Sequence, residues 1–248
     1  MPPSTLEWLG LDGGGAADVA ACDSAESRDA SALVARGLLL AGVLHAAGAG
    51  DRGLLAGLKA HRVAWLLAPK ALGAWHVHCM LSAAPLESLM LFSSVGSGLG
   101  NIGQGSYAAA NACLDALALC RRMHAATACS LQWPLVGGAG MGAAAFGRLS
   151  DQGITIAGMA GISLEDYASC LGAHLEGRSS IALSVRLVHR ADAGELLRDL
   201  ADASQLRFGE LASTVTSARA TDTITPGAGR ALSALADDLS LIHISEPT

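Results

Sequence analysis

Apolar runs of strand length alternate with longer segments of helical periodicity along most of the chain. The predicted strands are residues 18–22, 41–46, 89–94, 128–133 and 181–188. The predicted helices are residues 30–40, 54–67 continuing through Pro69 into 71–80, and 107–125. Strands separated by helix-length segments are typical of βαβ units in a parallel sheet. Because the strands are apolar throughout, we expect an α/β fold whose doubly wound sheet is covered on both faces.

Small and polar residues follow the predicted strands at their carboxyl ends. They are Asp23, Ala46, Ala47, Gly48, Ser93, Ser94 and Pro134. In open α/β sheets, ligands bind in the crevice outside these strand ends. The pattern therefore predicts a ligand site along one edge of the sheet, where a cofactor would lie.

Four polar side chains around residues 89–94 form a candidate set for proton delivery. Tyr107 and Asn111 are four residues apart on a predicted helix, so they share a face. An ammonium from Lys70 would make it easier for the tyrosine to give up its proton, and Lys70 could also hold a ribose hydroxyl. Ser94 could donate to a carbonyl oxygen, and Asn111 could hold a water that reprotonates the tyrosine. The set indicates a general acid that protonates a carbonyl as hydride arrives.

Each of these signals has an ordinary structural explanation when it is taken alone. A serine pair at the end of a strand is typical of turns, and a tyrosine four residues before an asparagine is common on helices. Their combination with Lys70 and with the small residues Ala46, Ala47 and Gly48 favours a functional site.

Composition and charge exclude several classes of function. The 248 residues carry a net charge of −6 and no basic patch, which argues against nucleic acid or an anionic membrane as a partner. The six cysteines show no CxxC pairing, and cysteines and histidines lack metal-ligand spacing, so we expect reduced thiols and no metal. Residues 88–114 carry no charge, but their glycines and amides argue against a membrane helix. We expect a cytoplasmic protein, with organelle targeting left open.

The segment LFSSVGSGLGNIGQGSYAAANACLDALA closely resembles the ketoreductase domain of modular polyketide synthases, a branch of the short-chain dehydrogenase/reductase superfamily. GVLHAAGAGDRGLL, APKALGAWHVH around Lys70 and SLQWPLVGGAGM fit the same family, so the resemblance covers about residues 6–197. The family places its lysine upstream and an asparagine four residues after the tyrosine. Most other short-chain dehydrogenases instead have YxxxK, and residues 107–111, YAAAN, follow the polyketide arrangement.

The resemblance implies NADPH-dependent reduction of a β-ketoacyl thioester to the β-hydroxyacyl thioester. The substrate would hang from an acyl carrier protein by a phosphopantetheine arm, beside other synthase domains. The family pattern makes Tyr107 the proton donor and Ser94 the group that binds the ketone oxygen, with support from Lys70 and Asn111. The residues implied near the cofactor are Asp23, Ala46, Ala47, Gly48, Lys70 and Pro134.

The family begins with a strand, a GGTGxxG phosphate loop, a helix and a second strand, in the sheet order 3-2-1-4-5-6-7. Gly13, Gly14 and Gly15 lack the spacing of that loop and follow no predicted strand. We therefore expect a Rossmann-like sheet without its first two strands, in a chain truncated at its N-terminus. Without the helix N-terminus that binds the pyrophosphate, the chain alone should bind NADPH poorly and show no turnover.

Smaller departures concern stereochemistry and the cofactor pocket. Gly50-Asp51-Arg52 stands where one ketoreductase subtype has LDD, and Leu99 stands where the other has tryptophan, so neither product configuration is indicated. Pro134 and Val136 replace a glycine and a tryptophan that are usual in the family.

We expect residues 1–203 to form the ketoreductase domain, with residues 147–175 as a lid that includes a helix at 163–175. Residues 204–239 resemble a flexible linker, and residues 240–248 resemble translated sequencing-adapter sequence. Two alternatives stay open: the corresponding domain of a multidomain fatty acid synthase, and a half-domain that only scaffolds a synthase without catalysis.

Overall fold

The computed structural model describes residues 22–36, 40–50, 55–100, 103–137, 161–175, 185–189 and 240–242, with single pairs between 197 and 213. Its five-stranded sheet has the order β1-β2-β3-β4-β5. The strands are β1 (Gly42–His45), β2 (Ser88–Ser94), β3 (Cys129–Trp133), β4 (Val185–His189) and β5 (Ser240–Ile242). β1 to β4 are parallel and β5 is antiparallel to β4. The predicted α/β fold with a parallel sheet is confirmed.

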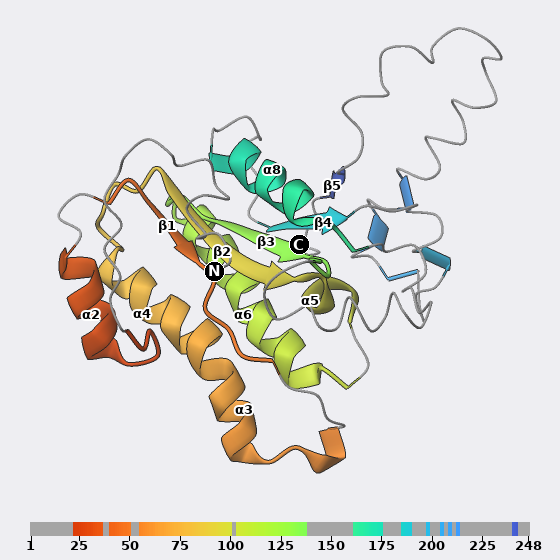
Figure 1. The fold of residues 1–248 in the computed structure, drawn as a ribbon, viewed down its shortest axis with the longest axis horizontal. Coiled ribbons are helices and arrows are strands. Elements are labelled where there is room, and N and C mark those ends of the chain that lie inside the picture. Colours follow the sequence, from red (N-terminus) through yellow and green to blue (C-terminus); the bar gives the residue numbers. More distant parts are fainter. Residues whose placement is uncertain are drawn as a thin grey trace, which may run out of the picture.

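Helices cover both faces of this sheet (Figure 1). They are α2 (Ser27–Arg36), α3 (Ala60–Leu67), α4 (Gly73–Met80), α5 (Val95–Leu99), α6 (Gly105–Met123) and α8 (Leu164–Leu175), with a 3-10 turn η1 at Leu55–Gly57. Figure 1 shows α3, α4 and α6 on one side of the sheet and α8 on the other. Across the described ranges, none of the helices has both the length and the hydropathy to cross a bilayer.

The glycine-rich segment after β2 contains the short helix α5, which was not among the predicted helices. Ser94 starts it, because the Ser94 Oγ accepts a hydrogen bond from the Gly96 backbone N–H at 3.2 Å. Gly100 ends it with φ of +85°, a backbone conformation that glycine adopts without strain. The sequence pattern contained no sign of α5, because glycine has a poor helix propensity and five residues are too few to show helical periodicity.

Several predictions concern residues outside the described ranges: the strand at 18–21, the glycines at 13–15, residues 147–160 of the lid and the linker at 214–239. The helix expected at 163–175 is present as α8. Ser163 caps it, donating its backbone N–H to the Asp166 carboxylate and accepting from the Asp166 N–H. Strand β5 falls within residues 240–248, which resemble translated sequencing-adapter sequence, and the domain boundaries stay predictions.

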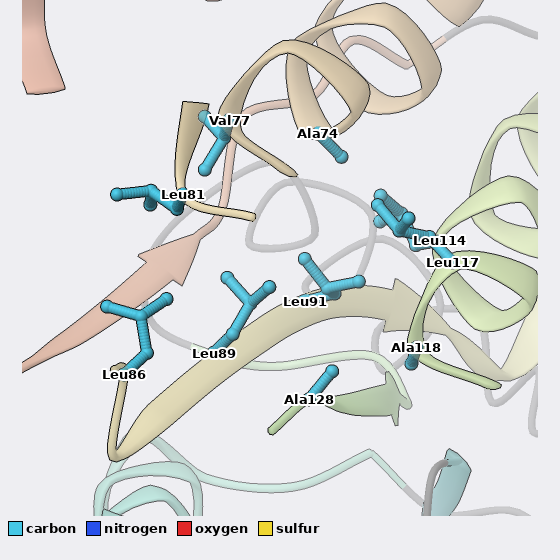
Figure 2. Close-up of a cluster of buried hydrophobic side chains, with 10 residues drawn as sticks. All are labelled: Ala74, Val77, Leu81, Leu86, Leu89, Leu91, Leu114, Leu117, Ala118 and Ala128. Atoms are coloured by element: carbon cyan, nitrogen blue, oxygen red, sulfur yellow. The ribbon is translucent and has the colours of Figure 1, made fainter. Parts of the chain in front are cut away.

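An apolar cluster joins β2 to α4 and α6 (Figure 2). Its buried members are Ala74, Val77, Leu81, Leu86, Leu89, Leu91, Leu114, Leu117, Ala118 and Ala128. Figure 2 shows Leu89 and Leu91 of β2 directed toward the helices that carry Val77 and Leu114. Burial of these side chains fixes α6, and with it the residues at the start of that helix, against the sheet.

A second cluster covers the opposite face of the sheet under α8. It contains Met90, Leu131, Trp133, Ile162, Cys170 and Leu171. Phe92 and Tyr167 pack against it, and the ring centroids of Trp133 and Tyr167 are 4.5 Å apart. Alternation along β2 sends Leu89 and Leu91 to one cluster and Met90 and Phe92 to the other. The two clusters hold β2 rigidly just before the serines at its carboxyl end.

Candidate active site

The two serines that end β2 have different environments. Ser93 is 5% exposed, and its Oγ donates to the Asn111 carbonyl oxygen at 3.3 Å and lies 3.2 Å from the Ser97 Oγ. Ser94 points to the other side of the strand and is partly exposed. Because the Ser94 Oγ accepts from the Gly96 N–H, that bond leaves its own proton available for a substrate oxygen. The geometry thus separates a structural serine, Ser93, from a candidate binding serine, Ser94.

Tyr107 and Asn111 lie on the same face of α6, as their spacing predicts. Asn111 is fully buried, and its Nδ2 donates to the Tyr107 carbonyl oxygen at 2.8 Å. Its Oδ1 is also buried and has no hydrogen-bond partner. Because a buried amide oxygen is usually paired, the Asn111 Oδ1 marks a place for a water molecule or a ligand group.

Lys70 enters the site from a π-helical turn, η2 (Ala68–Leu72), between α3 and α4. Pro69 has no backbone N–H to continue the α-helical ladder, and the wider turn accommodates this loss. The Lys70 side chain is 3% exposed, and its Nζ donates to the Phe92 carbonyl oxygen at 2.7 Å. The same Nζ lies 5.9 Å from the centroid of the Tyr107 ring. The structure therefore brings Lys70 and Tyr107 together although 36 residues separate them in sequence.

Burial lowers the pKa of Lys70 to about 8, and the negative charge of Asp115 opposes this fall. Below that pH the side chain is an ammonium with three donors, of which Phe92 uses one. A positive charge with spare donors beside a tyrosine is the arrangement that the sequence predicts. It suits both a hydroxyl ligand and a developing phenolate.

His45, the last residue of β1, was not among the predicted site residues, yet it lies beside the lysine turn. It is 5% exposed, and its Nε2 lies 3.1 Å from the Pro69 carbonyl oxygen. Burial, with a smaller effect of the Lys70 charge, lowers the pKa of His45 to about 4. The ring is therefore neutral near pH 7, and its Nε2 must carry a proton to donate to that carbonyl. The signal in the sequence was the family-like segment GVLHAAGAGDRGLL, which contains His45.

Asp115 is a second residue that sequence reasoning missed. Its carboxylate accepts hydrogen bonds from Ser97, Ser130 and Gln132. Two signals were present in the sequence: Asp115 continues the four-residue spacing of Tyr107 and Asn111, and it is the first charge after the uncharged residues 88–114. Within the described ranges, no group of three histidine, cysteine or acidic side chains could hold a metal ion.

The predicted cofactor residues lie at the strand ends. Ala46, Ala47 and Gly48 directly follow β1, and Pro134 is buried directly after β3. The register pairs Ser94 with Trp133, so the ends of β2 and β3 are level. Their roles stay predictions.

Asp23 lies further out and is exposed, just before α2. Its Oδ1 accepts from the Ala25 N–H, and its own N–H donates to Asp29. The neighbouring Ser24 packs against Gly73, where a Cβ would come within 2.5 Å of the Ser24 Oγ. The neighbour of Asp23 therefore contacts the residue that follows the lysine turn, whereas the hydrogen bonds of Asp23 itself stabilise the start of α2.

Comparison with known proteins identifies the family. The family model described as KR domain matches residues 10–138 of this chain. This chain belongs to the KR domain family. It contains the ketoreductase signature of modular polyketide synthases, on the short-chain dehydrogenase type of fold.

The curated proteins that resemble this chain include several polyketide synthases. Polyketide synthase GfsA of Streptomyces halstedii is 38% identical over 221 residues, which cover 84% of this chain and 3% of GfsA. The spectinabilin polyketide synthase system protein NorB of Streptomyces orinoci is 38% identical over 192 residues, or 73% of this chain and 9% of NorB. The chain thus spans a small part of these multidomain relatives.

Among solved structures, an A-type ketoreductase from a modular polyketide synthase superposes with a TM-score of 0.67 at 29% identity. The match covers 80% of this KR chain and 41% of the ketoreductase chain. The two proteins share a fold, and the chain spans less than half the length of that ketoreductase.

Proposed function

We propose that this chain carries the proton-donating half of a ketoreductase that reduces a β-ketoacyl thioester with NADPH. The substrate would be delivered by an acyl carrier protein through a phosphopantetheine arm, with the other domains of a polyketide synthase nearby. The observation that carries the proposal is the position of the buried Lys70 Nζ. It lies 5.9 Å from the centroid of the Tyr107 ring and donates a hydrogen bond to the carbonyl oxygen of Phe92, two residues before Ser94 on β2.

The residues of the site fit a nicotinamide cofactor. Lys70 has donors left for ribose hydroxyls, and the small side chains of Ala46, Ala47 and Gly48 leave room at the end of β1. Pro134 would line the nicotinamide side and Asp23 the adenine side. When bound, NADPH would supply the hydride, while the protein supplies orientation and electrostatics.

Each polar group then has a task at a defined atom. The Ser94 hydroxyl donates to the ketone oxygen and orients it. The Tyr107 hydroxyl gives its proton to that oxygen as the alcohol forms. The Lys70 ammonium stabilises the negative charge that remains on the Tyr107 oxygen. The unpartnered Asn111 Oδ1 holds a water molecule through which a proton returns to Tyr107.

The test is a fusion in which the part of the solved A-type ketoreductase that precedes its match to this chain is joined to the start of this chain, which spans 41% of that ketoreductase. We expect the fusion, and not the chain alone, to oxidise NADPH when a β-ketoacyl thioester is added. Tyr107→Phe should slow kcat by about 10²–10⁴-fold, because the general acid is removed. NADPH affinity and the unfolding temperature should stay close to those of the unsubstituted fusion.

Two matched variants sharpen the assay. Tyr167→Phe removes the other tyrosine hydroxyl of the chain, on α8, and should leave kcat within a few-fold. Ser94→Ala should reduce kcat, whereas Ser93→Ala should mainly reduce stability. A folded, NADPH-binding fusion that reduces the thioester no faster than its Tyr107→Phe variant would contradict the proposal.

A further inference from the structure

The short helix α5 carries the candidate binding serine at its start. Ser94 is its N-cap residue, and the Ser94 Oγ accepts from the Gly96 backbone N–H at 3.2 Å. The direction of the Ser94 hydroxyl therefore depends on where the first turn of α5 lies. A helix of five residues that include Gly96 and Gly98 has little stability of its own. Contacts with neighbouring elements must therefore hold α5 in place.

Ser97 of α5 makes such contacts through its hydroxyl. The Ser97 Oγ lies 2.6 Å from the Asp115 Oδ2 on α6 and 2.8 Å from the Ser94 carbonyl oxygen. It also lies 3.2 Å from the Ser93 Oγ. A hydroxyl has one proton, so Asp115 and the Ser94 carbonyl share the Ser97 donor. Because bonds to a carboxylate are stronger than bonds between neutral groups, Ser97 ties the residue that caps α5 firmly to α6.

Strand β3 fixes the carboxylate to which Ser97 is bonded. The Ser130 Oγ donates to the Asp115 Oδ1 at 2.6 Å, and the Gln132 Nε2 donates to the Oδ2 at 2.8 Å. Both donors are buried on β3. The close approach of α5 to the same strand is visible at Gly98, where a Cβ would come within 2.7 Å of the Gln132 Oε1. Ser97 thus bonds to an acceptor whose own position is set by the sheet.

We propose that Ser97 is a positioning residue, which holds the first turn of α5 against Asp115 and so directs the Ser94 hydroxyl toward the substrate oxygen. The importance of this direction for catalysis rests on the function proposed above. The effect of Ser97 on the α5 turn does not, because it can be measured on the chain without substrate or cofactor.

Two serine variants form a matched pair for the test. Ser97→Ala and Ser130→Ala each remove one hydroxyl that lies 2.6 Å from the Asp115 carboxylate. Ser97 also contacts the Ser94 carbonyl, whereas Ser130 donates from β3. The pair therefore separates the position of the α5 turn from the general stability of the hydrogen bonds around Asp115.

The first measurement is amide hydrogen exchange in the chain by itself, followed by NMR. The reporter is the Gly96 N–H, which is bonded to the Ser94 Oγ, and the Leu91 N–H in the middle of β2 serves as the reference for opening of the whole fold. In Ser97→Ala, Gly96 should exchange about tenfold faster relative to Leu91, because a lost bond to a charged group makes local opening easier. In Ser130→Ala, this ratio should stay near that of the wild type.

The second measurement is turnover by the fusion described above. Ser97→Ala should lower kcat about tenfold and leave the KM for NADPH unchanged, because a misdirected donor stabilises the reacting oxygen less well. Ser97→Thr keeps the hydroxyl and should recover most of the loss. Ser130→Ala should lower the unfolding temperature and leave kcat within a few-fold. In a Ser94→Ala background, Ser97→Ala should change kcat little, since the hydroxyl that it directs is already gone.

An unchanged exchange rate of Gly96 in Ser97→Ala would overturn the proposal. So would an equal fall in kcat in Ser97→Ala and Ser130→Ala, because the effect would then come from general stability. A full tenfold loss from Ser97→Ala in the Ser94→Ala background would also contradict it, since Ser97 would then act independently of Ser94. If the unsubstituted fusion reduces no thioester, the proposed function is refuted, and the exchange of Gly96 still decides whether Ser97 holds the turn.

Discussion

The α6-facing side of the sheet has two halves with opposite chemistry. Toward the start of β2, Leu89 and Leu91 form an apolar cluster with α4 and α6 (Figure 2). Toward its carboxyl end, Ser93 and the Phe92 carbonyl meet Asn111 and Lys70. The same strand and the same helix build both halves, separated by about one turn of α6.

The two halves differ in how completely their groups are satisfied. Hydrophobic packing is non-directional, and the apolar half is filled by buried alanine, valine and leucine side chains. By contrast, the described residues contain three buried side-chain polar atoms without a hydrogen-bond partner: the Asn111 Oδ1, the Gln132 Oε1 and the Trp133 Nε1. Asn111 and Gln132 belong to the polar half, whereas Trp133, at the end of β3, lies in the cluster on the opposite face of the sheet. The apolar half is fully packed, whereas the polar half has buried atoms without hydrogen-bond partners. This is expected where a ligand or a water molecule supplies the remaining hydrogen bonds.

The largest expected effect on stability lies in the apolar half. Leu114 is fully buried between β2 and α4, so Leu114→Ala should lower the free energy of unfolding by about 3 kcal/mol. Leu114→Met, which conserves volume, should lower it by less than about 1.5 kcal/mol. Urea unfolding followed by circular dichroism measures both. Equal losses for the two variants would contradict the close packing described for this half.

The contribution of the polar half to the free energy of unfolding should depend on pH, whereas the contribution of the apolar half should not. The pKa of Lys70 is about 8 in the folded chain, below the ordinary value of 10.5. Between these values the unfolded chain binds a proton that the folded chain does not, so this side chain makes folding more favourable as pH rises. From pH 8 to 10.5, the wild type should gain about 3 kcal/mol of unfolding free energy relative to Lys70→Met.

The measurement is a series of urea unfolding curves between pH 7 and 10.5. Lys59→Met is the matched control, because Lys59 is exposed and should follow the wild type at every pH. Parallel pH profiles for Lys70→Met and the wild type would show that the ammonium is not desolvated by folding. The two halves of the α6-facing side would then respond to pH in the same way.

The sequence pattern predicted the apolar half better than the polar half. Periodicity located β1 to β4 and α6, because apolar burial repeats at intervals that a linear pattern records. Spacing also predicted that Tyr107 and Asn111 share a face, and the family motif indicated Lys70. The sequence pattern predicted that the helical segment continues through Pro69 into residues 71–80, but not that the continuation takes the form of a π-helical turn.

His45 and Asp115 were missed for a common physical reason. Each acts through partners distant in sequence: His45 through the Pro69 carbonyl, and Asp115 through side chains of α5 and β3. Neither partnership has a periodic signature, since both depend on which strands become neighbours. A buried polar network is specified by the complete fold, whereas a buried apolar face is already visible in one element.

The smallest expected effect tests whether the polar half behaves as one coupled unit. Burial and the charge of Lys70 together hold the pKa of His45 at about 4, below its ordinary value of 6.5. In Lys70→Met the charge is lost and the burial remains, so the His45 midpoint should rise but stay below 6.5. The Cε1–H NMR signal, assigned with His45→Gln, measures this midpoint, and Lys59→Met should leave it unchanged.

Because the unfolded chain protonates this histidine first, stability that the wild type loses between pH 6.5 and 4 should be partly restored in Lys70→Met. If the His45 midpoint is the same in both proteins, burial alone sets it, and the polar half is a group of independent sites and not a coupled one.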